Sequence, residues 1–270
     1  MVVQHNLTAM NTNRQLGLTT SAQAKSTEKL SSGYKINRAG DDAAGLSISE
    51  KMRSQIRGLN KASDNAQDGI SLIQVAEGAL NETHSILQRM NELATQAAND
   101  TNTSVDRQSI KDEIEQLNEE LDRISTTTQF NKQDLLTGGF SGKLQVGALK
   151  GQTMDVKISL AVSAKGLKVS DVEVSTNVKA GAAMQSIQDA IESVSKQRSK
   201  LGAIQNRLEH TINNLDTNAE NTQAAESRIR DTDMADEMVQ YSKNNILSQA
   251  GQSMLAQANQ SNQGVLSLLQ

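Results

Sequence analysis

A heptad run of apolar residues is the feature that most constrains this chain. Positions seven residues apart carry Met52, Leu59, Ala66, Ile73, Leu80, Leu87 and Ala94. Apolar partners stand three or four residues after members of this run, at Ile56, Ile70, Met90 and Ala97. Because the chain contains no proline, which breaks helix interiors, this pattern predicts one amphipathic helix from about Asp42 to about Asn99. Such a helix would be about 80 Å long and would need partners along its whole length.

Four further helices are expected around this one. Residues 5–33 are helix-permissive but carry few apolar residues. After the turn NDTNTSVD, with Ser104 or Asp106 as the N-cap, a second seam predicts a helix that folds back antiparallel on the first, with Ile110, Ile114, Leu117, Leu121 and Ile124 along it. Another seam runs from near Val178 to Ala219, and a polar break from Asn221 to Asp233 separates it from a last helix that begins at about Ala235.

Between about residues 128 and 177 the pattern changes from helical to alternating. The segments LQVGA, MDVKISL and VSDVEVS alternate polar and apolar residues and lie among glycine-bearing turns. They predict three short strands arranged in hairpins. The expected fold class is therefore mainly α: an elongated antiparallel helical bundle or coiled coil, with a small β-hairpin region at the middle of the sequence.

The composition excludes several classes of protein. With two Phe, two Tyr and no Trp, the core must be thin and aliphatic. The absence of cysteine excludes disulfides, thiolate zinc sites and a cysteine nucleophile. A net charge of −4 without a dense basic run argues against nucleic-acid binding. No window approaches the roughly 18 apolar residues of a membrane span, and the N-terminal segment lacks a signal-peptide pattern, so we expect neither membrane insertion nor the ordinary export route.

No constellation of catalytic or ligand-binding residues is found. His5, His84 and His210 are far apart in the sequence, and the phosphate-binding and nucleophile motifs are missing. Asp41 and Asp42 precede the long helix, which favours a helix-capping role over cation binding. The segment DTDMADE lacks the central glycine and the terminal glutamate of a calcium loop, and it too precedes a helix. We therefore expect no enzymatic activity, no cofactor and no metal site.

The stretch SSGYKINRAGDDAAGL predicts a joint between helices. Gly33, Gly40 and Gly45 suit turns with positive φ. Arg38 is the candidate in this loop for a contact between subunits. The sequence leaves open whether Arg38 pairs with a carboxylate of its own chain or of a neighbour.

The last helix carries an apolar stripe with no large domain beside it in the sequence, made of Leu247, Ala250, Met254, Ala258, Val265 and Leu269. A helix that lies on a membrane usually has a Lys/Arg-rich polar face and aromatic anchors, whereas the polar face here is mostly Gln, Asn and Ser. Burial between chains is therefore favoured. We expect the first and last segments to meet, and to be unfolded in the monomer and ordered on assembly.

Several long segments of this chain closely resemble bacterial flagellin: LSSGYKINRAGDDAAGLSISEKMRSQIRGL, SLIQVAEGALNETHSILQRMNELATQAAND, TQFN and NILSQAGQSMLAQANQSNQGVLSLLQ. The resemblance covers about residues 1–130 and 180–270. It implies a structural subunit that self-assembles into the bacterial flagellar filament for motility, in a minimal form without large variable outer domains. It also implies three regions: an N-terminal inner-tube helix and spoke loop at 1–45, an outer core domain at 46–220 with its β region at about 128–177, and a C-terminal spoke and inner-tube helix at 221–270.

The resemblance further implies partners and a location. The protein would be extracellular, exported by the flagellar type III apparatus without a cleaved signal peptide. Its partners would be further copies of itself, a flagellin export chaperone at the C-terminal segment, and the cap and hook-junction proteins. Its candidate residues for assembly between subunits are Arg38, Leu247, Met254, Val265 and Leu269.

Flagellins are also ligands of a host Toll-like receptor, and the resemblance carries this role to named positions. The matching receptor-contact candidates are Gln88, Arg89, Leu93 and Glu113. Asn91 stands where many recognised flagellins carry Arg.

Two alternative readings share part of the pattern. A hook–filament junction protein of the same superfamily has similar ends, but such proteins usually match the central helical motifs less closely. A helical signalling rod, such as a chemoreceptor cytoplasmic domain, would lack a β insert.

Overall fold

The computed structural model describes the backbone of residues 6–268 and the side chains of residues 6–261. Its elements in chain order are α1 (Leu7–Ser32), α2 (Ala43–Ala97), α3 (Ser104–Thr127), β1 (Gln129–Phe130), β2 (Gln133–Asp134), β3 (Phe140–Gln145), β4 (Thr153–Ile158), α4 (Asn177–Arg230) and α5 (Met234–Leu268). The chain divides into two compact units: unit 1 comprises Met1–Ser54 and Asn221–Gln270, and unit 2 comprises Gln55–Glu220. The predicted mainly helical fold with small antiparallel strand pairs is confirmed.

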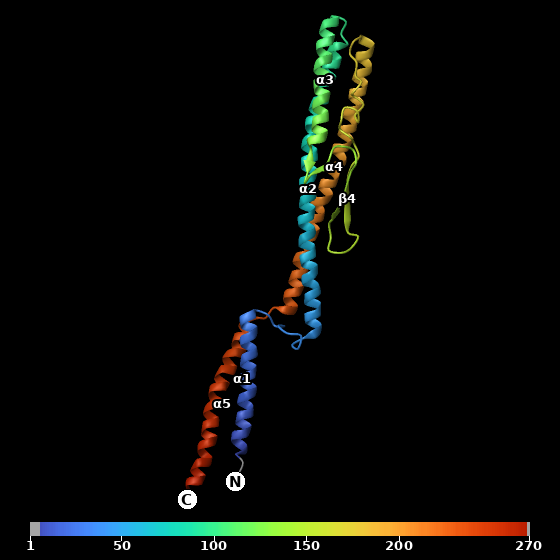
Figure 1. Ribbon diagram of the computed structural model, residues 1–270. Coiled ribbons are helices and arrows are strands. Elements are labelled where there is room, and N and C mark those ends of the chain that lie inside the picture. Colours follow the sequence, from blue (N-terminus) through green and yellow to red (C-terminus); the bar gives the residue numbers. More distant parts are fainter. Residues whose placement is uncertain (1–5, 269–270) are drawn as a thin grey trace. The chain divides into compact units, whose positions relative to one another are not determined.

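In unit 1, α1 and α5 lie side by side (Figure 1). Near the start of α1, Asn6 Nδ2 donates to the carbonyl of Ala258 at 3.0 Å. Near the end of α1, the Lys29 ammonium lies 3.4 Å from the Glu237 carboxylate. Because these contacts join the start of each helix to the far part of the other, the pair is antiparallel. The expected meeting of the first and last segments is therefore confirmed.

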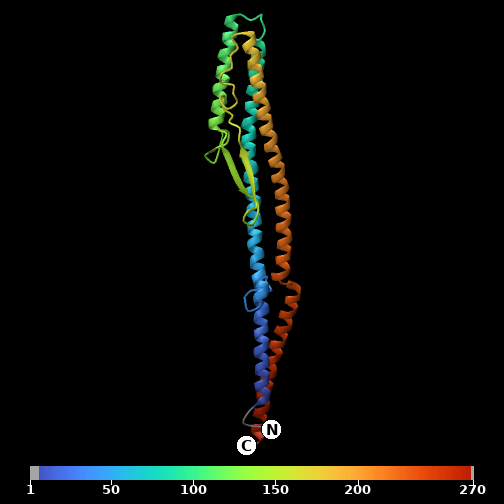
Figure 2. The ribbon, with the colours of Figure 1, turned by 90° about the vertical axis from the view of Figure 1, so that its right-hand side faces the viewer.

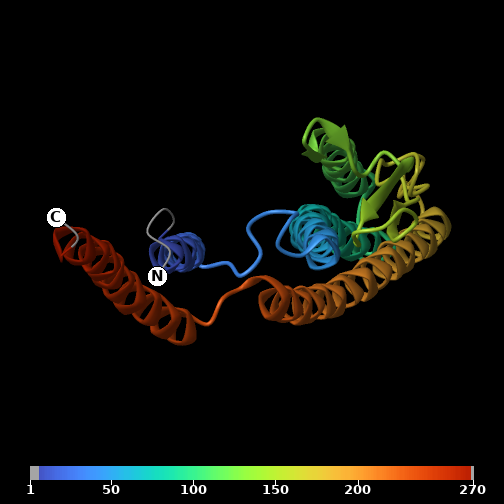
Figure 3. The same cartoon turned by 90° about the horizontal axis from the view of Figure 1, so that it is seen from below.

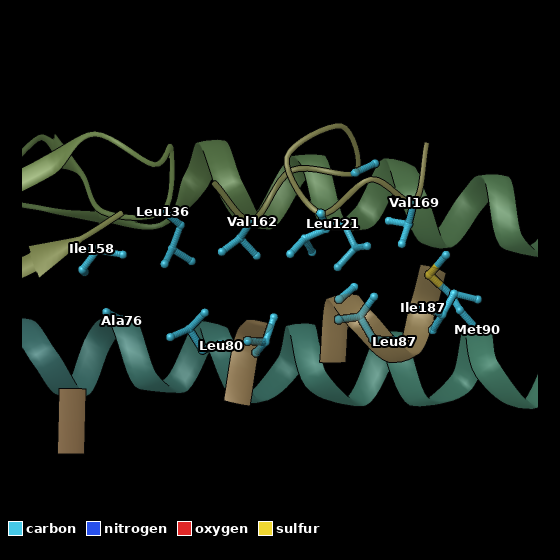
Figure 4. Close-up of a cluster of buried hydrophobic side chains, with 14 of the residues drawn as sticks. Ala76, Leu80, Leu87, Met90, Leu121, Leu136, Ile158, Val162, Val169 and Ile187 are labelled. Carbon is cyan, nitrogen blue, oxygen red and sulfur yellow. The ribbon is translucent and has the colours of Figure 1, made fainter. Parts of the chain in front are cut away.

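In unit 2, α2 lies beside α3 and α4 (Figure 2), and residues of its heptad run form one buried cluster with residues of those two helices. Every residue of the run from Leu59 to Ala94 is buried. In Figure 4, Leu80 and Met90 of α2 point toward the side of the cluster where Leu121 of α3 lies. The predicted amphipathic helix is confirmed, and its core is aliphatic, as the scarcity of aromatic residues requires.

The turn from α2 to α3 uses a different N-cap from the two predicted. Thr103 Oγ1 accepts from the backbone N–H of Asp106 at 3.3 Å, and the Asp106 carboxylate accepts from the backbone N–H of Thr103 at 2.9 Å. This reciprocal capping box makes Thr103 the cap and Asp106 its partner in the first turn, so the prediction of Ser104 or Asp106 was wrong. Across the turn, the Arg107 guanidinium donates to the carbonyl of Ala97 at 3.1 Å and satisfies an acceptor at the end of α2.

The larger strand pair of the middle region is β3–β4. Phe140 lies opposite Ile158, and Gln145 lies opposite Thr153, in an antiparallel register. The segment MDVKISL supplies most of β4, as predicted, whereas LQVGA contributes only its first residues to β3. The strand β4 buries alternate residues, namely Met154, Val156 and Ile158.

The third predicted strand is wrong. The segment VSDVEVS contains no strand, although Val169 and Val174 are buried. Val172 and Val174 alternate with polar residues as in a strand, but the segment packs on helices and has no strand beside it to pair with. A small pair, β1–β2, escaped the sequence analysis; its turn places Asn131 and Lys132 at positive φ.

The middle region is held by one amide side chain from each long helix of unit 2. Asn65 of α2 donates to a backbone carbonyl of β3 at 3.1 Å, and Asn118 of α3 donates to a carbonyl of the loop after β4 at 3.2 Å. Gln197 of α4 is buried and donates to a carbonyl of β4 at 3.3 Å. Strands and loops therefore lie between α3 and α4, as the view along the helices shows (Figure 3).

The predicted polar break before α5 is too long. The helix α4 continues through Asn221 to Arg230, because that polar stretch contains neither glycine nor proline and includes the good helix formers Gln, Ala, Glu and Arg. The actual break is residues 231–233. It ends where Asp233 Oδ1 accepts from the backbone N–H groups of Ala235 and Asp236, at 2.9 and 3.3 Å.

The three glycines of the first joint differ in their roles. Gly33 ends α1 with φ at 76°, as predicted. Gly40 and Gly45 do not have positive φ, so that part of the prediction was wrong. Gly45 lies inside α2, where a Cβ would stand 2.5 Å from Asp42 Oδ2 and 2.8 Å from Ile36 Cδ1. Glycine is required there for lack of space. Asp42 caps α2 by accepting from the Gly45 N–H at 2.9 Å, and this bond holds the Asp42 side chain where a Cβ of residue 45 would lie.

Candidate assembly interface

The inner face of the α1–α5 pair is built from small residues. Ser26 and Ser248 are the buried side chains of the pair within the part that the structure describes, at 5% and 7% exposure. Leu16 packs over Gly251, where an added Cβ would lie 3.3 Å from Leu16 Cδ1. Small residues let two helices approach closely but remove little apolar surface from water. Hydrophobic burial therefore stabilises this pair only weakly.

Apart from Leu16, Leu30, Tyr241 and Leu255, which are half-buried, the large apolar side chains of the pair within the described residues face solvent instead. They are Leu7, Met10 and Leu18 on α1, with Met234, Met238, Val239, Ile246, Leu247 and Met254 on α5. At about 100° per residue, Leu7, Met10 and Leu18 fall within about 80° of one another, on the side of α1 opposite Leu16. A helix that is apolar beyond its packed face is typical of one buried on several sides. The pair thus has the surface of an unfinished helical bundle.

Two of the predicted assembly residues line one groove along this pair. Leu247 and Met254, 47% and 57% exposed, border a groove of about 490 Å³ together with Leu16 of α1. Val265 lies in α5, but its side chain is outside the described residues, and Leu269 is outside them altogether. The groove is open to solvent and large enough for side chains of another helix.

The two connecting segments of unit 1 are bonded to each other. The Gly33 carbonyl accepts from the Thr232 N–H at 3.0 Å, and the Lys35 N–H donates to the Arg230 carbonyl at 2.7 Å. Tyr34 forms an isolated antiparallel bridge with the residue that follows Arg230. The segment after α1 is therefore joined to the end of α4 through the main chain.

Arg230 locks this joint, and the sequence analysis missed it. Its guanidinium carbon lies 4.6 Å from the centroid of the Tyr34 ring, and Nη1 lies 3.0 Å from the Glu50 carboxylate. The Arg230 side chain is only 13% exposed, and its Nε is buried without a hydrogen-bond partner. The only signal in the sequence was a basic residue in the last turn of a helix, which ordinarily indicates no more than a favourable charge at a helix end.

Arg38, the predicted contact residue of the first joint, pairs within its own chain. Its Nε lies 3.0 Å from the Glu28 carboxylate, and its side chain is still 76% exposed. Asp41 does not cap α2, so that prediction was wrong; its carboxylate instead accepts from the backbone N–H groups of Arg38 and Asn37, at 3.0 and 3.3 Å. These two N–H groups hold the pKa of the Asp41 carboxyl below its ordinary value.

The receptor-contact candidates lie on the α2–α3 face of unit 2. Arg89 Nε and Nη2 donate to the Glu113 carboxylate at 3.1 and 2.9 Å, and this carboxylate raises the pKa of Arg89. Gln88 is exposed beside them. Leu93 is only 2% exposed and belongs to the core, so the structure does not place it at the surface with the other three. Asn91 is half-buried, with its Oδ1 unpartnered.

Neither a metal cluster nor a membrane-spanning helix occurs in the part of the chain that the structure describes. Within residues 6–261, no group of three or more His, Asp and Glu side chains could hold a metal ion. His84 contacts Gln88 at 3.0 Å and His210 borders a separate groove beside the β3–β4 turn, while His5 is outside the described residues. None of the described helices combines the length and the apolar character needed to cross a membrane.

Comparison with known proteins covers the chain from end to end. A family described as "Bacterial flagellin N-terminal helical region" matches residues 3–141, and one described as "Bacterial flagellin C-terminal helical region" matches residues 184–269. A flagellin of Halalkalibacterium halodurans is 56% identical over 273 residues, with 100% of both chains covered. The flagellar filament 31.3 kDa core protein of Treponema maltophilum is 51% identical over 286 residues, again with 100% of both covered. The crystal structure of Bacillus cereus flagellin superposes with a TM-score of 0.51 at 33% identity, covering 60% of this chain and 94% of that one.

Proposed function

Because this chain belongs to the bacterial flagellin family, it is a structural subunit that polymerises into the flagellar filament, and we propose that the α1–α5 pair is the surface through which it polymerises. As a filament subunit it is part of the extracellular flagellum. One observation carries the proposal: among the described residues, the side chains that the α1–α5 pair buries are two serines, and most of its large apolar side chains are exposed.

Polymerisation would remove these side chains from water. Burying one large apolar side chain contributes about 1.5–3 kcal/mol, so several per subunit drive association strongly. Leu247 and Met254 border the groove that would receive side chains of a neighbouring subunit. Val265 stands eleven residues after Met254, which is nearly the same face of a helix at about 100° per residue, and Leu269 is proposed from the sequence pattern alone. Arg38, highly exposed, is placed to exchange its partner for a carboxylate of a neighbour.

The same observation supports coupled ordering and assembly. A helix pair with so little buried apolar surface opens at low free energy. In the free subunit α1 and α5 would therefore be largely unfolded, and they would become ordered when neighbours cover their outer faces.

We assign residues 1–45 and 221–270 to the inner tube and its spokes, and residues 46–220 to the outer core. The distribution of apolar burial supports this assignment. Within the described part of unit 1, Ile36 is the one buried hydrophobic residue, whereas unit 2 holds the extensive aliphatic core. A region with its own core folds alone, and a region without one depends on its neighbours.

The exposed apolar face of α5 also indicates that a partner covers this helix before the subunit polymerises. Met234, Met238 and Val239 are all exposed near its start, and such a surface promotes premature association. We infer that an export chaperone holds the C-terminal segment, that the flagellar type III apparatus exports the chain, and that the cap and hook-junction proteins meet the same ends.

A second proposed role is as a ligand of the host Toll-like receptor for flagellin. Gln88, Arg89 and Glu113 would contact the receptor through the exposed side chains of α2 and α3, and the Arg89–Glu113 ion pair would fix their arrangement. Leu93 would support this face from beneath rather than touch the receptor. With Asn91 in place of Arg, we expect recognition to be weaker than that of flagellins that carry Arg there.

Polymerisation of a truncated chain tests the assembly role. Monomers are incubated in high salt with filament seeds and viewed by negative-stain microscopy. The full chain should form filaments, and a chain lacking residues 236–270 should form none while keeping most of its helical circular dichroism. A truncated chain that still polymerises would overturn the role given to α5. Identity over the full chain to filament flagellins favours this function over that of a hook–filament junction protein.

A further inference from the structure

The methionines of this chain divide by exposure. Four of the described ones are 48% to 64% exposed and all belong to α1 or α5, namely Met10, Met234, Met238 and Met254. Two in unit 2 are buried, Met90 at 0% and Met154 at 8%. Two more are partly buried, Met52 and Met184, and Met1 is outside the described residues. Since the chain has no cysteine, its thioethers are its readily oxidised sulfur groups.

We propose that the four exposed methionines form a peroxide-sensitive modification site that controls polymerisation, an inference that rests on the assembly role of the α1–α5 pair. In this step a lone pair of the thioether sulfur attacks one oxygen of hydrogen peroxide. The S–O bond forms as the O–O bond breaks, and the departing oxygen leaves as water after proton transfer. Methionine is oxidised by two electrons to the sulfoxide, and the peroxide is reduced.

Oxidation changes the outer surface of the pair from apolar to polar. A sulfoxide oxygen is a strong acceptor, and burying it without a donor is unfavourable. Met254 lies in the groove beside Leu247, Ala250 and Gly251 of its own helix, and the donors of this groove, Asn11 and Gln15 among them, belong to α1. Met234 and Met238 stand one helical turn apart, so their sulfoxides would make a shared face at the start of α5 more polar. Each sulfoxide thus opposes the burial that polymerisation requires.

The position of the site makes the free subunit sensitive and the filament resistant. In the free subunit, peroxide reaches all four sulfurs, since each is about half exposed or more. In the filament, the same sulfurs are covered by neighbouring subunits. Oxidant therefore stops growth without dismantling existing filaments, and methionine sulfoxide reductases can restore the subunit.

The first test maps the oxidation. Monomers and preformed filaments are treated with hydrogen peroxide, and sulfoxides are located by peptide mass spectrometry. We expect Met10, Met234, Met238 and Met254 to be oxidised in the monomer before Met90 and Met154, and to be protected in the filament. Equal rates for the exposed and buried groups, or equal rates in monomer and filament, would overturn the proposal.

The second test measures seeded growth. Loss of even one buried methionine contact changes an assembly equilibrium by about tenfold, so peroxide should raise the critical concentration of wild-type protein by at least about tenfold, and reductase treatment should reverse this. A variant with Met10, Met234, Met238 and Met254 all changed to Leu keeps the apolar volume and should grow after peroxide treatment. The matched control, Met90→Leu with Met154→Leu, should stay peroxide-sensitive.

The outcomes of this second test separate the two claims. Untreated wild-type protein that does not grow would overturn the assembly role and the methionine site with it. Untreated protein that grows, together with peroxide-treated protein that grows equally well, would overturn the methionine site alone. Peroxide inhibition that persists in the four-leucine variant would also overturn the site, because the lesion would lie elsewhere.

Discussion

The guanidinium carbon of Arg230 lies 4.6 Å from the centre of the Tyr34 ring, so the last turn of α4 is tied to the segment that follows α1. The same guanidinium lies 3.0 Å from the Glu50 carboxylate near the start of α2. Three stretches of chain that are distant in sequence therefore meet on one side chain. The Arg230 contacts therefore oppose local opening of the connecting segments of unit 1.

Replacing Arg230 with Ala should loosen this joint. A cation–π contact on a mostly buried arginine contributes about 1–2 kcal/mol, so local opening should become about five- to thirtyfold more frequent. Limited digestion with a broad-specificity protease measures this, as faster cleavage within residues 33–42. Arg228→Ala, at an exposed position in the same turn, is the matched control and should leave the rate unchanged. The same rate for both variants would show that Arg230 does not hold the joint.

Substitution at a buried heptad position should cost more stability than substitution at an exposed position of the same helix. Leu80 is fully buried, and Leu80→Ala should lower the free energy of unfolding of unit 2 by about 2–5 kcal/mol. Val75 is on the same helix but 42% exposed, and Val75→Ala should cost less than about 0.5 kcal/mol. Urea unfolding followed by circular dichroism measures both. Similar losses would contradict the heptad as the origin of the core.

The burial of the heptad residues could be predicted from the sequence, because their period places them on one face of a helix. An apolar residue every seven positions, in a chain without proline, leaves one helix face to cover, and Leu59 to Ala94 are indeed buried. The stripe of α5 was equally readable, since Leu247 and Met254 interrupt a polar surface. What the stripe could not reveal is the small-residue face that adjoins it, because Ser248 and Gly251 look like ordinary polar surface until α1 lies against them.

Other features depend on contacts between distant segments and could not be predicted. Val172 and Val174 alternate with polar residues as in a strand, but no strand lies beside them to pair with. Gly45 is required for space beside Ile36 rather than for backbone freedom. Arg230 acquires its role only when Tyr34 and Glu50 come beside it. No local pattern contains such information.

The capping box of α3 should make stability depend on pH. The Thr103 hydroxyl and then its N–H lower the pKa of Asp106. Because the folded pKa is below that of the unfolded chain, the ionised carboxylate stabilises the fold above about pH 4, and the contribution is lost as pH falls through the folded pKa. Asp106→Asn should therefore lower Tm at neutral pH, with a difference from wild type that narrows in acid.

Thermal unfolding across this pH range provides the measurement for Asp106. Glu119→Gln removes another exposed carboxylate from α3 and serves as the control. At neutral pH the Tm of Glu119→Gln should differ from that of wild type by less than the Tm of Asp106→Asn does. A constant difference between Asp106→Asn and wild type at every pH would contradict the role of the ionised cap.

The receptor proposal predicts a selective loss of signalling. Arg89→Ala removes a cation and releases Glu113, so a reporter cell that carries the Toll-like receptor should respond about tenfold less, as for loss of an anchoring arginine. Arg123→Ala breaks a comparable exposed ion pair, with Glu120 on α3, and should signal normally. An unchanged response to Arg89→Ala would exclude this face as the contact.

Hydrogen exchange in monomer and filament tests the central claim most directly. If the α1–α5 pair lacks a core of its own and is completed by neighbouring subunits, amides of Leu7–Ser32 and Met234–Leu268 should exchange rapidly in the monomer and slowly in the filament. Amides around Leu80 and Leu121 should be protected in both. Equal protection of α1 and α5 in the two states would contradict the account.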